Sequence, residues 1–355
     1  MTLKVGLTYN LRRKVGANEN LPEDFYIEFD DAETVEAIAL ALRRGGCKVI
    51  KIEANLDAYS KLRRLKPDIV FNIAEGLHGE ARESHIPVIL EMLRIPYTGS
   101  GPTTLAICLD KALTHKILSA HGIPSPKFQV FKRADEKISD DLSFPLVIKP
   151  LAEGSSKGVR SSSLVKDEQS LRKQLSWVIK TYNQPAIAEE FLPGREFTVG
   201  LIGNESPIVL PIVEIRVDKL PSGASPIYSY EAKWIWDTPE KPLDIFECPA
   251  NIPLNLENKI KDIAAQTFKV LNCRDLCRID MRLDVKGEPR VLEVNPLPGL
   301  IPNPDAHSCL PEAARAAGLT YDQLICTILW QALKRYGLHE LVEAKTLREL
   351  VFHPF

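Results

Sequence analysis

Along the first hundred residues, short continuous runs of apolar residues alternate with segments whose apolar residues recur at helical spacing. Continuous apolar runs predict three buried strands, at Lys4–Tyr9, Lys48–Ile52 and Asp68–Asn72. Asp30 or Asp31 can cap a helix before the second run, with the apolar face Val35, Ile38, Ala39 and Leu42. Two glycines, Gly45 and Gly46, are expected to end this helix. The alternation of strands and helices favours a parallel sheet covered by helices.

The rest of the chain continues this mixture after a turn-rich segment at Thr98–Thr104. Its periodicity predicts helices at Leu109–Ala120, Asp167–Lys180, Leu256–Leu271 and Tyr321–Tyr336. It predicts strands at Lys127–Phe131, Pro145–Lys149, Glu196–Ile202 and Ile208–Ile215, and a hairpin at Arg278–Asn295. We therefore expect an α/β chain, α+β in its second half, with units at 1–108, 109–191 and 192–337 and an extension at 338–355.

Composition narrows the class of protein. Hydrophobic residues make up 45% of the chain, and 45 basic against 47 acidic residues give a net charge of −2. A nucleic-acid partner is not expected, because no basic stripe is present. The longest uncharged segment, Ile95–Leu109, is too short and too rich in proline and glycine to span a membrane. Seven cysteines without disulfide spacing, and a start that reads as a strand rather than a signal peptide, favour a cytoplasmic protein.

The segment RIDMRLDVKGEPRVLEVN carries the most informative chemistry. A two-residue turn at Lys286-Gly287 would place Val285 opposite Glu288, and hence Asp280 opposite Glu293 and Arg278 opposite Asn295. Like charges opposed on a ladder are destabilising, so a positive group is expected between them. Two carboxylates and an amide beside a phosphate suit Mg²⁺. The alternative is a solvated hairpin face with salt bridges to nearby arginines.

A glycine–serine loop follows a predicted strand in FPLVIKPLAEGSSKGV. The strand delivers Lys149 to a turn, and the loop Glu153–Gly158 offers backbone N–H groups that can surround phosphate oxygens. The pattern is not that of a P-loop. By itself, such a loop is more often a simple hairpin connection.

Four weaker candidates remain open between a structural or surface role and a binding role. Lys111 begins a helix, where a cation opposes the helix dipole and an anionic ligand would relieve it. Lys233, in YEAKW, is a second candidate of this kind. Gly299, in NPLPGLIPNP, would let a backbone N–H approach a substrate. His78 lies in a polar loop with Glu83, at the mouth expected above the parallel sheet.

Taken together and in this order, the segments resemble the D-alanine–D-alanine ligase family of ATP-grasp enzymes. The resemblance covers about Phe71–Leu324 and is carried by these segments: LHGEARE, PYTGSG, LDKALTHKIL, VIKPLAEGSSKGV, IAEEFLPGREFTV, YEAKW, CRIDMRLD and LEVNPLPG. It implies an ATP-grasp fold preceded by a Rossmann-like domain, residues 1–108. The central ATP-grasp subdomain would then be 109–191, and the ATP-grasp domain with the metal site 192–337.

The resemblance also implies the residues that bind ATP and metal. The lysines that contact the phosphates match Lys111 and Lys149, and Lys233 matches the mobile-loop lysine that reaches the γ-phosphate. The phosphate loop includes Glu153, Gly154, Ser155, Ser156 and Gly158. The hinge around the adenine matches Glu189, Glu190, Phe191 and Leu192, and the ribose-binding carboxylate matches Glu196. Two Mg²⁺ ions, which Mn²⁺ could replace, match Asp280, Glu293 and Asn295.

Substrate and intermediate contacts are implied in the same way. Arg278 and the Gly299 N–H match groups that stabilise the tetrahedral intermediate. His78 and Glu83 match residues near the first substrate, and Ser155 is the loop serine beside it. The implied reaction converts a carboxylate and ATP into an acyl phosphate, which an amine then attacks. The partners expected are ATP and amino acids, and the family commonly forms homodimers.

The chain departs from the family pattern where substrates are chosen. The glutamate that holds the first substrate's ammonium has no clear match, and Glu28 or Asp30 could replace it. Trp234 stands in place of a tyrosine, which removes a hydroxyl near Ser155, and Glu190 replaces a lysine after the hinge glutamate. No serine follows Gly299 before Ser308, so an altered acceptor pocket is expected. D-Alanine–D-alanine ligation is the leading reading. The alternatives are a ligase for another acid and amine, and a nucleotide-binding protein without ligase activity.

Overall fold

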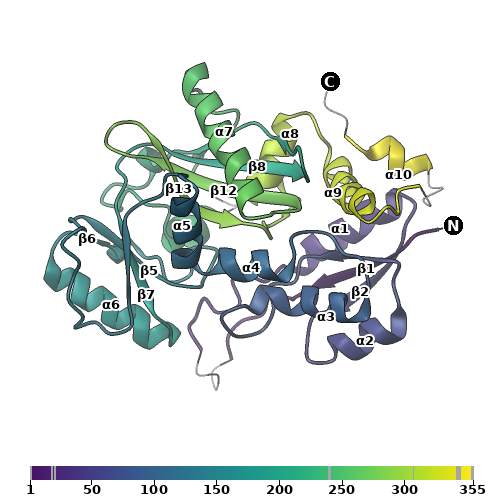
Figure 1. Ribbon diagram of the computed structural model, residues 1–355, viewed down its shortest axis with the longest axis horizontal. Coiled ribbons are helices and arrows are strands. Elements are labelled where there is room, and N and C mark those ends of the chain that lie inside the picture. Colours follow the sequence, from purple (N-terminus) through teal and green to yellow (C-terminus); the bar gives the residue numbers. More distant parts are fainter. Residues whose placement is uncertain are drawn as a thin grey trace.

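The residues that the structure describes form three β-sheets with covering helices (Figure 1). The computed structural model describes residues 2–16, 19, 21–238, 241–306, 308–340 and 345–352. Each sheet lies within one of the three units expected from the sequence. Within the described residues, no helix is both long and apolar enough to cross a membrane.

The first sheet is parallel, as predicted, with the strand order β2-β1-β3. Its strands are β1 (Lys4–Tyr9), β2 (Lys48–Glu53) and β3 (Ile69–Asn72). Its helices are α1 (Ala32–Arg44), α2 (Ala58–Leu65) and α3 (His85–Leu93). Asp31 is the N-cap of α1, because its carboxylate accepts a hydrogen bond from the Thr34 N–H at 2.7 Å. The chain therefore enters α1 directly after the acidic segment at 28–31.

The second sheet is antiparallel, with the order β4-β7-β5-β6. Its strands are β4 (Phe128–Phe131), β7 (Ala186–Glu190), β5 (Leu146–Pro150) and β6 (Leu164–Val165), and α6 (Glu168–Tyr182) packs on it. The helix expected at Leu109–Ala120 is confirmed as α5 (Lys111–Ala120), which begins two residues later, and a separate helix that was not predicted, α4 (Pro102–Leu109), precedes it. Asp110 between them is extended and caps α5 through the Leu113 N–H at 2.9 Å. This break makes Lys111 the first residue of a new helix.

The third sheet has the order β11-β10-β8-β12-β13, with β9 also paired to β8. Its strands are β8 (Glu196–Gly203), β9 (Ile208–Val209), β10 (Val213–Ile215), β11 (Phe246–Glu247), β12 (Asp275–Leu283) and β13 (Pro289–Asn295). The helix α7 (Leu254–Val270) packs on it. The single strand expected at Ile208–Ile215 is wrong: it is divided into β9 and β10. Pro211 lies at the break and has no N–H to continue a ladder.

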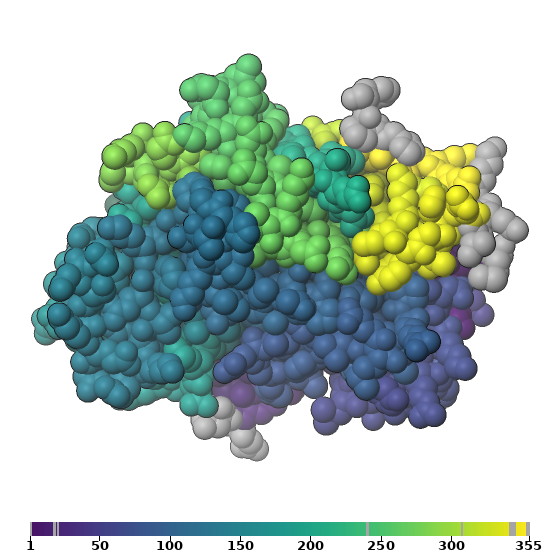
Figure 2. All heavy atoms as spheres, in the orientation of Figure 1, coloured from purple at the N-terminus to yellow at the C-terminus, as the bar shows by residue number. Residues whose placement is uncertain are grey.

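The C-terminal helices complete the core of the first unit. They are α8 (Cys309–Ala316), α9 (Tyr321–Arg335) and α10 (Lys345–Leu350). Leu42 of α1, Leu329 of α9 and Leu347 of α10 are fully buried in one hydrophobic cluster with β1 and β3. Figure 2 shows this segment lying against both the N-terminal unit and the third sheet. The extension at 338–355 therefore contributes packing, through the residues in it that the structure describes.

Candidate active site

The hairpin of β12 and β13 forms one wall of a cavity between the three units. Arg278 is opposite Asn295, and Asp280 is opposite Glu293, as predicted. All four line the cavity. The predicted turn is wrong, however, because the loop contains Val285, Lys286 and Gly287 between a paired Asp284 and Glu288. A β-bulge at Leu292 offsets the extra loop residue and restores the register at the site.

Positive side chains neutralise the opposed carboxylates of this hairpin. Lys111 Nζ lies 2.9 Å from Glu293 Oε1, and Arg278 Nη2 lies 2.8 Å from Asp280 Oδ2. Burial opposes the charge on both members of the first pair. The ion pair outweighs it, raising the pKa of Lys111 and lowering that of Glu293. The positive group expected between the carboxylates is therefore supplied in part by the chain itself.

Lys149 enters the same cavity from the end of β5. Its ammonium lies 2.6 Å from Glu189 Oε2, and His115 Nε2 lies 3.2 Å from the other oxygen of that carboxylate. Glu189 is buried, and the charge of Lys149 keeps its pKa low despite burial. Glu189 thus fixes the position of the Lys149 ammonium. None of the predicted hinge residues lines the cavity, although Glu190, Phe191 and Leu192 continue directly from the strand that carries Glu189.

The phosphate loop lies against the long loop that carries Lys233 and Trp234. Ser155 and Ser156 both have positive φ, 50° and 60°, a conformation that costs energy in residues other than glycine. The Ser156 hydroxyl donates to the Tyr228 carbonyl at 3.1 Å, and Trp234 Nε1 donates to the Ser155 carbonyl at 3.0 Å. The hydroxyl missing at residue 234 is therefore replaced, at this contact, by an indole N–H.

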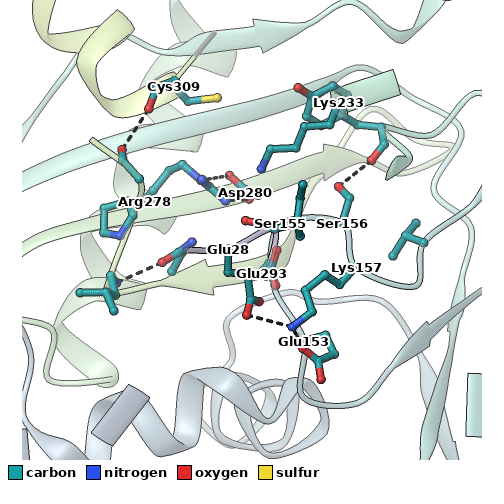
Figure 3. A pocket seen from close by; sticks show the side chains of 18 of the residues that line it. Glu28, Glu153, Ser155, Ser156, Lys157, Lys233, Arg278, Asp280, Glu293 and Cys309 are labelled. Carbon is teal, nitrogen blue, oxygen red and sulfur yellow. Dashed lines mark hydrogen bonds and ion pairs between the residues drawn. The ribbon is translucent and has the colours of Figure 1, made fainter. Parts of the chain in front are cut away.

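Lys233 lies in a short π-helical turn, Ala232–Trp236, and reaches into the cavity. Figure 3 shows Lys233 and Arg278 both directed toward Asp280. Burial and the nearby Arg278 lower the pKa of Lys233 to about 8. Two cations that close together in a buried site favour an anionic ligand between them.

Gly299 and Ser308 meet at the far end of the hairpin wall. The Ser308 hydroxyl donates to the Gly299 carbonyl at 3.0 Å, and both residues line the cavity. The sequence places no serine between Gly299 and Ser308, and the structure brings Ser308 itself to this part of the cavity. The loop after Gly299 is long but returns Ser308 to it, directly before α8. Cys309, the first residue of α8, also lines the cavity, and burial raises the pKa of its thiol to about 11.

Acidic residues of the first unit also line the cavity. Glu28 is in contact with two cations, with Arg82 at 2.9 Å and Lys157 at 3.1 Å. Asp30 and Glu75 line the cavity without a hydrogen-bonded or ion-paired side-chain partner among the described residues. Burial raises the pKa of Asp30 to about 7 and that of Glu75 well above its usual value. Of the two carboxylates proposed for an ammonium group, Asp30 is the one left free.

Three further predicted site residues are His78, Glu83 and Glu196, and only the last of them lines the main cavity. His78 is exposed, packs 5.5 Å from the Phe25 ring, and lines a second cavity. Glu83 lines neither cavity, and burial raises its pKa to about 7. Glu196 lines the main cavity, with its carboxylate 3.0 Å from Arg282 Nη1. The structure therefore brings Glu196 to the site but not His78 or Glu83.

Sequence reasoning missed Arg12, Glu75 and Lys157, which line the cavity, and Arg82, which lines the second cavity and contacts Glu28. Arg82 and Lys157 lie inside LHGEARE and EGSSKG, two segments already singled out in the sequence. Their partners are distant in sequence: Glu28 precedes them by 54 and 129 residues. No periodicity links such positions.

The donor set at the hairpin fits Mg²⁺. It offers two carboxylates and one amide oxygen, and the part of the chain that the structure describes contains no cluster of three or more acidic, histidine or cysteine ligands. Mg²⁺ is usually held by one or two carboxylates together with substrate phosphates. Lys111 and Arg278, which pair with the two carboxylates, also add positive charge that would stabilise phosphate groups at the site.

Comparisons with known proteins agree with this arrangement. Residues 117–330 match the family model described as D-ala D-ala ligase C-terminus. The D-alanine–D-alanine ligase of Pelotomaculum thermopropionicum is 34% identical, over 86% of this chain and 93% of its own length. An uncharacterized protein of Sinorhizobium fredii is 36% identical, over 85% of this chain and 88% of its own length.

A solved structure supports the fold independently. The D-alanine–D-alanine ligase of Bacillus anthracis, solved with ATP, matches with a TM-score of 0.70 and 24% identity, covering 95% of this chain and 99% of that protein. With its three-sheet architecture and its converging lysines and carboxylates, this chain belongs to the D-alanine–D-alanine ligase family of ATP-grasp enzymes.

Proposed function

We propose that the protein is an ATP-dependent D-alanine–D-alanine ligase that supplies a precursor of the bacterial cell wall. The observation that carries the proposal is the convergence of four cations with the paired carboxylates of β12 and β13 on one cavity: Lys111, Lys149, Lys233 and Arg278. Such a surface fits a triphosphate and the negative charge that develops during phosphoryl transfer. The name of the Pelotomaculum relative supplies the substrate.

The reaction would proceed in two steps. A carboxylate oxygen of the first D-alanine attacks the γ-phosphorus of ATP, the bond to the β-phosphate oxygen breaks, and ADP leaves. The amine of the second D-alanine then attacks the acyl carbon, loses a proton, and expels inorganic phosphate. Lys111 and Lys149 would hold phosphates, and Lys233 would follow the γ-phosphoryl group as it moves. Arg278 and the Gly299 N–H would stabilise the oxyanion of the second step.

Asp280, Glu293 and Asn295 would hold Mg²⁺, for which the site has the right oxygen donors. The metal would supply charge neutralisation at the phosphate oxygens. Lys111 and Arg278, now paired with these carboxylates, would move to phosphate oxygens when ATP and the metal bind. Two ions are consistent with a pair of carboxylates on neighbouring strands.

Two groups of residues in the cavity would bind the two amino acids. Asp30 and Glu75 are carboxylates without an ionic partner among the described residues and suit the ammonium group of the first substrate. Ser308 and Gly299 offer a hydroxyl and a backbone N–H that suit the carboxylate of the second, provided that the hydroxyl turns away from the Gly299 carbonyl to which it now donates. We assign the protein to the cytoplasm as a homodimer. Its seven cysteines are all free thiols, as expected in a reducing compartment.

One observation favours a different first substrate. Arg12 lines the cavity, and its Nε donates to the Phe29 carbonyl at 2.8 Å. Its guanidinium carbon lies over the Trp234 ring, 5.0 Å from the ring centre. Its two terminal nitrogens have no hydrogen-bond partner among the described residues. An unpaired guanidinium beside Asp30 suits an amino acid with a second carboxylate.

The test is ADP release from Mg·ATP with D-alanine, D-aspartate, D-glutamate and their L-forms, alone and in pairs, with products identified by mass. ADP release with D-alanine alone and a D-alanyl-D-alanine mass would establish the proposed activity. A product that contains a dicarboxylic amino acid, with no reaction of D-alanine alone, would establish the second candidate. No ADP release with any pair would contradict both.

A further inference from the structure

Four buried charged side chains join the first unit to the phosphate loop. We call Glu28, Arg82, Glu153 and Lys157 the interdomain ion cluster. Arg82 Nη2 lies 2.9 Å from Glu28 and 3.0 Å from Glu153, and Lys157 Nζ lies 3.1 Å from Glu28 and 2.5 Å from Glu153. Each cation therefore contacts both carboxylates. The side chains are between 4% and 11% exposed, so the cluster is closed to solvent.

The cluster has equal numbers of positive and negative charges, and each stabilises the others. Burial would raise the pKa of Glu28, but Arg82 and Lys157 outweigh it and hold the pKa below the usual range. Burial likewise works against the charge of Arg82, and Glu28 and Glu153 outweigh it and raise its pKa. Removing one member of such a group leaves an uncompensated buried charge. The cluster is thus expected to form and open as a unit.

Backbone contacts extend the cluster over the whole phosphate loop. Glu28 Oε1 accepts a hydrogen bond from the Gly154 N–H at 2.6 Å, and Arg82 Nη1 donates to the Ala152 carbonyl at 2.8 Å. At the other end of the loop, Asp24 Oδ2 accepts from the Gly158 N–H at 3.2 Å and from the Tyr182 hydroxyl at 2.7 Å. The segment at 24–28 therefore holds both glycines of the loop.

We infer that Arg82 and Glu28 are positioning residues that hold the phosphate loop closed over the acyl phosphate. They touch no reacting atom themselves and act through Glu153, Lys157 and the backbone of the loop. An acyl phosphate hydrolyses when water reaches it, so a ligase needs this loop closed until the amine has attacked. The inference rests on the proposed ligase chemistry and gives Glu28 a role other than binding the ammonium of a substrate.

The first experiment compares two products of the same reaction. With Mg·ATP and the amino acids that the protein joins, ADP and the amide product are measured together for the wild type, Arg82→Ala, Arg82→Lys and Glu28→Gln. The wild type should give about one ADP for each amide bond. Arg82→Ala and Glu28→Gln should give a clear excess of ADP, at least about twofold, because open loops admit water. Arg82→Lys should restore part of the coupling.

Arg335→Ala is the matched control. Arg335 is a largely buried arginine in an ion pair, 16% exposed, with its Nη2 2.6 Å from Asp275, but it joins α9 to β12 and does not line the cavity. This variant should lose stability but still release about one ADP for each amide bond. An unchanged ratio in Arg82→Ala, with a loss of stability like that of Arg335→Ala, would reduce the cluster to a structural role and overturn the inference.

The second experiment needs no turnover, so it separates the inference from the proposed function. Deuterium exchange is followed at the backbone amides of residues 153–158. Exchange there should be at least about tenfold faster in Arg82→Ala than in the wild type, and unchanged in Arg335→Ala. Equal protection in all three proteins would overturn the inference. Tighter ATP binding by Glu28→Gln would also overturn it, because Glu28 would then compete with phosphate for the Gly154 N–H.

Discussion

Asp280 and Glu293 face each other across β12 and β13, each paired with a different cation. Opposed carboxylates destabilise a ladder unless positive charge lies beside them. Arg278 neutralises the first and Lys111 the second, from two separate units of the chain. The two carboxylates and their two cations therefore form a charge arrangement that a metal ion and a triphosphate would complete.

Glu293→Gln should abolish ADP formation and leave the fold intact. The amide keeps the shape of the side chain but loses the negative charge that holds a cation, and we expect turnover to fall by at least about a thousandfold. The measurement is ADP release at saturating Mg·ATP, with thermal unfolding as the check on folding. Glu288→Gln, in the same hairpin but exposed and paired with Lys259, is the control and should keep full activity. A folded Glu293→Gln protein with normal turnover would contradict the metal assignment.

Lys233→Ala should reduce kcat more than it raises KM for ATP. Lys233 lies in the turn Ala232–Trp236, lines the cavity, and is directed toward Arg278 and Asp280 (Figure 3). A group that acts on the phosphoryl group during transfer affects the transition state more than the bound substrate. Steady-state kinetics over a range of ATP concentrations measure the two effects.

Lys219→Ala is the control for this loop, because Lys219 is an exposed lysine paired with Asp244. It should change neither constant. If Lys233→Ala raised KM for ATP as much as it lowered kcat/KM, Lys233 would serve ground-state binding only.

The sequence predicted the hairpin register at Asp280 and Glu293, even though it predicted the wrong turn. Alternation with period two fixed which residues share the cavity face, and the bulge at Leu292 compensated for the extra loop residue. Lys111 was likewise predictable, because its helix start is a local signal. Helix breaks such as Asp110, and the strand break at Pro211, depend on local hydrogen bonds that periodicity does not reveal.

Contacts made by distant loops could not be predicted from the sequence. Ser308 meets Gly299 only because the intervening loop folds back onto the start of α8. Glu28 looked free for a substrate, yet it is held by Arg82 and Lys157, which belong to two other segments. Such contacts depend on how the units pack, which neither spacing nor composition determines.

Ser308→Ala should impair binding of the second substrate and spare the first step. The hydroxyl lines the cavity 3.0 Å from the Gly299 carbonyl, and Ser308 belongs neither to the loop Glu153–Gly158 nor to the β12–β13 hairpin. Removing one hydrogen bond to a charged group is expected to raise KM for the second amino acid by about tenfold. The measurement is amide formation over a range of second-substrate concentrations, with ATP binding as the control. An unchanged KM would place the carboxylate of the second substrate elsewhere.

Asp30→Asn should stabilise the protein at high pH while weakening the binding of the first substrate. Burial raises the pKa of Asp30 to about 7, so between about pH 4 and pH 7 the folded state holds a proton that the unfolded state has lost. The unfolding free energy therefore falls as pH rises through this range, and above it the buried charge exerts its full destabilising effect. Asparagine removes that effect. We expect the variant to gain melting temperature at about pH 8 and little at about pH 4, with a raised KM for the first amino acid. Thermal unfolding at the two pH values measures the first effect and steady-state kinetics the second. An equal gain at both pH values would mean that Asp30 is ionised throughout. A normal KM for the first amino acid would mean that Glu75, rather than Asp30, binds its ammonium group.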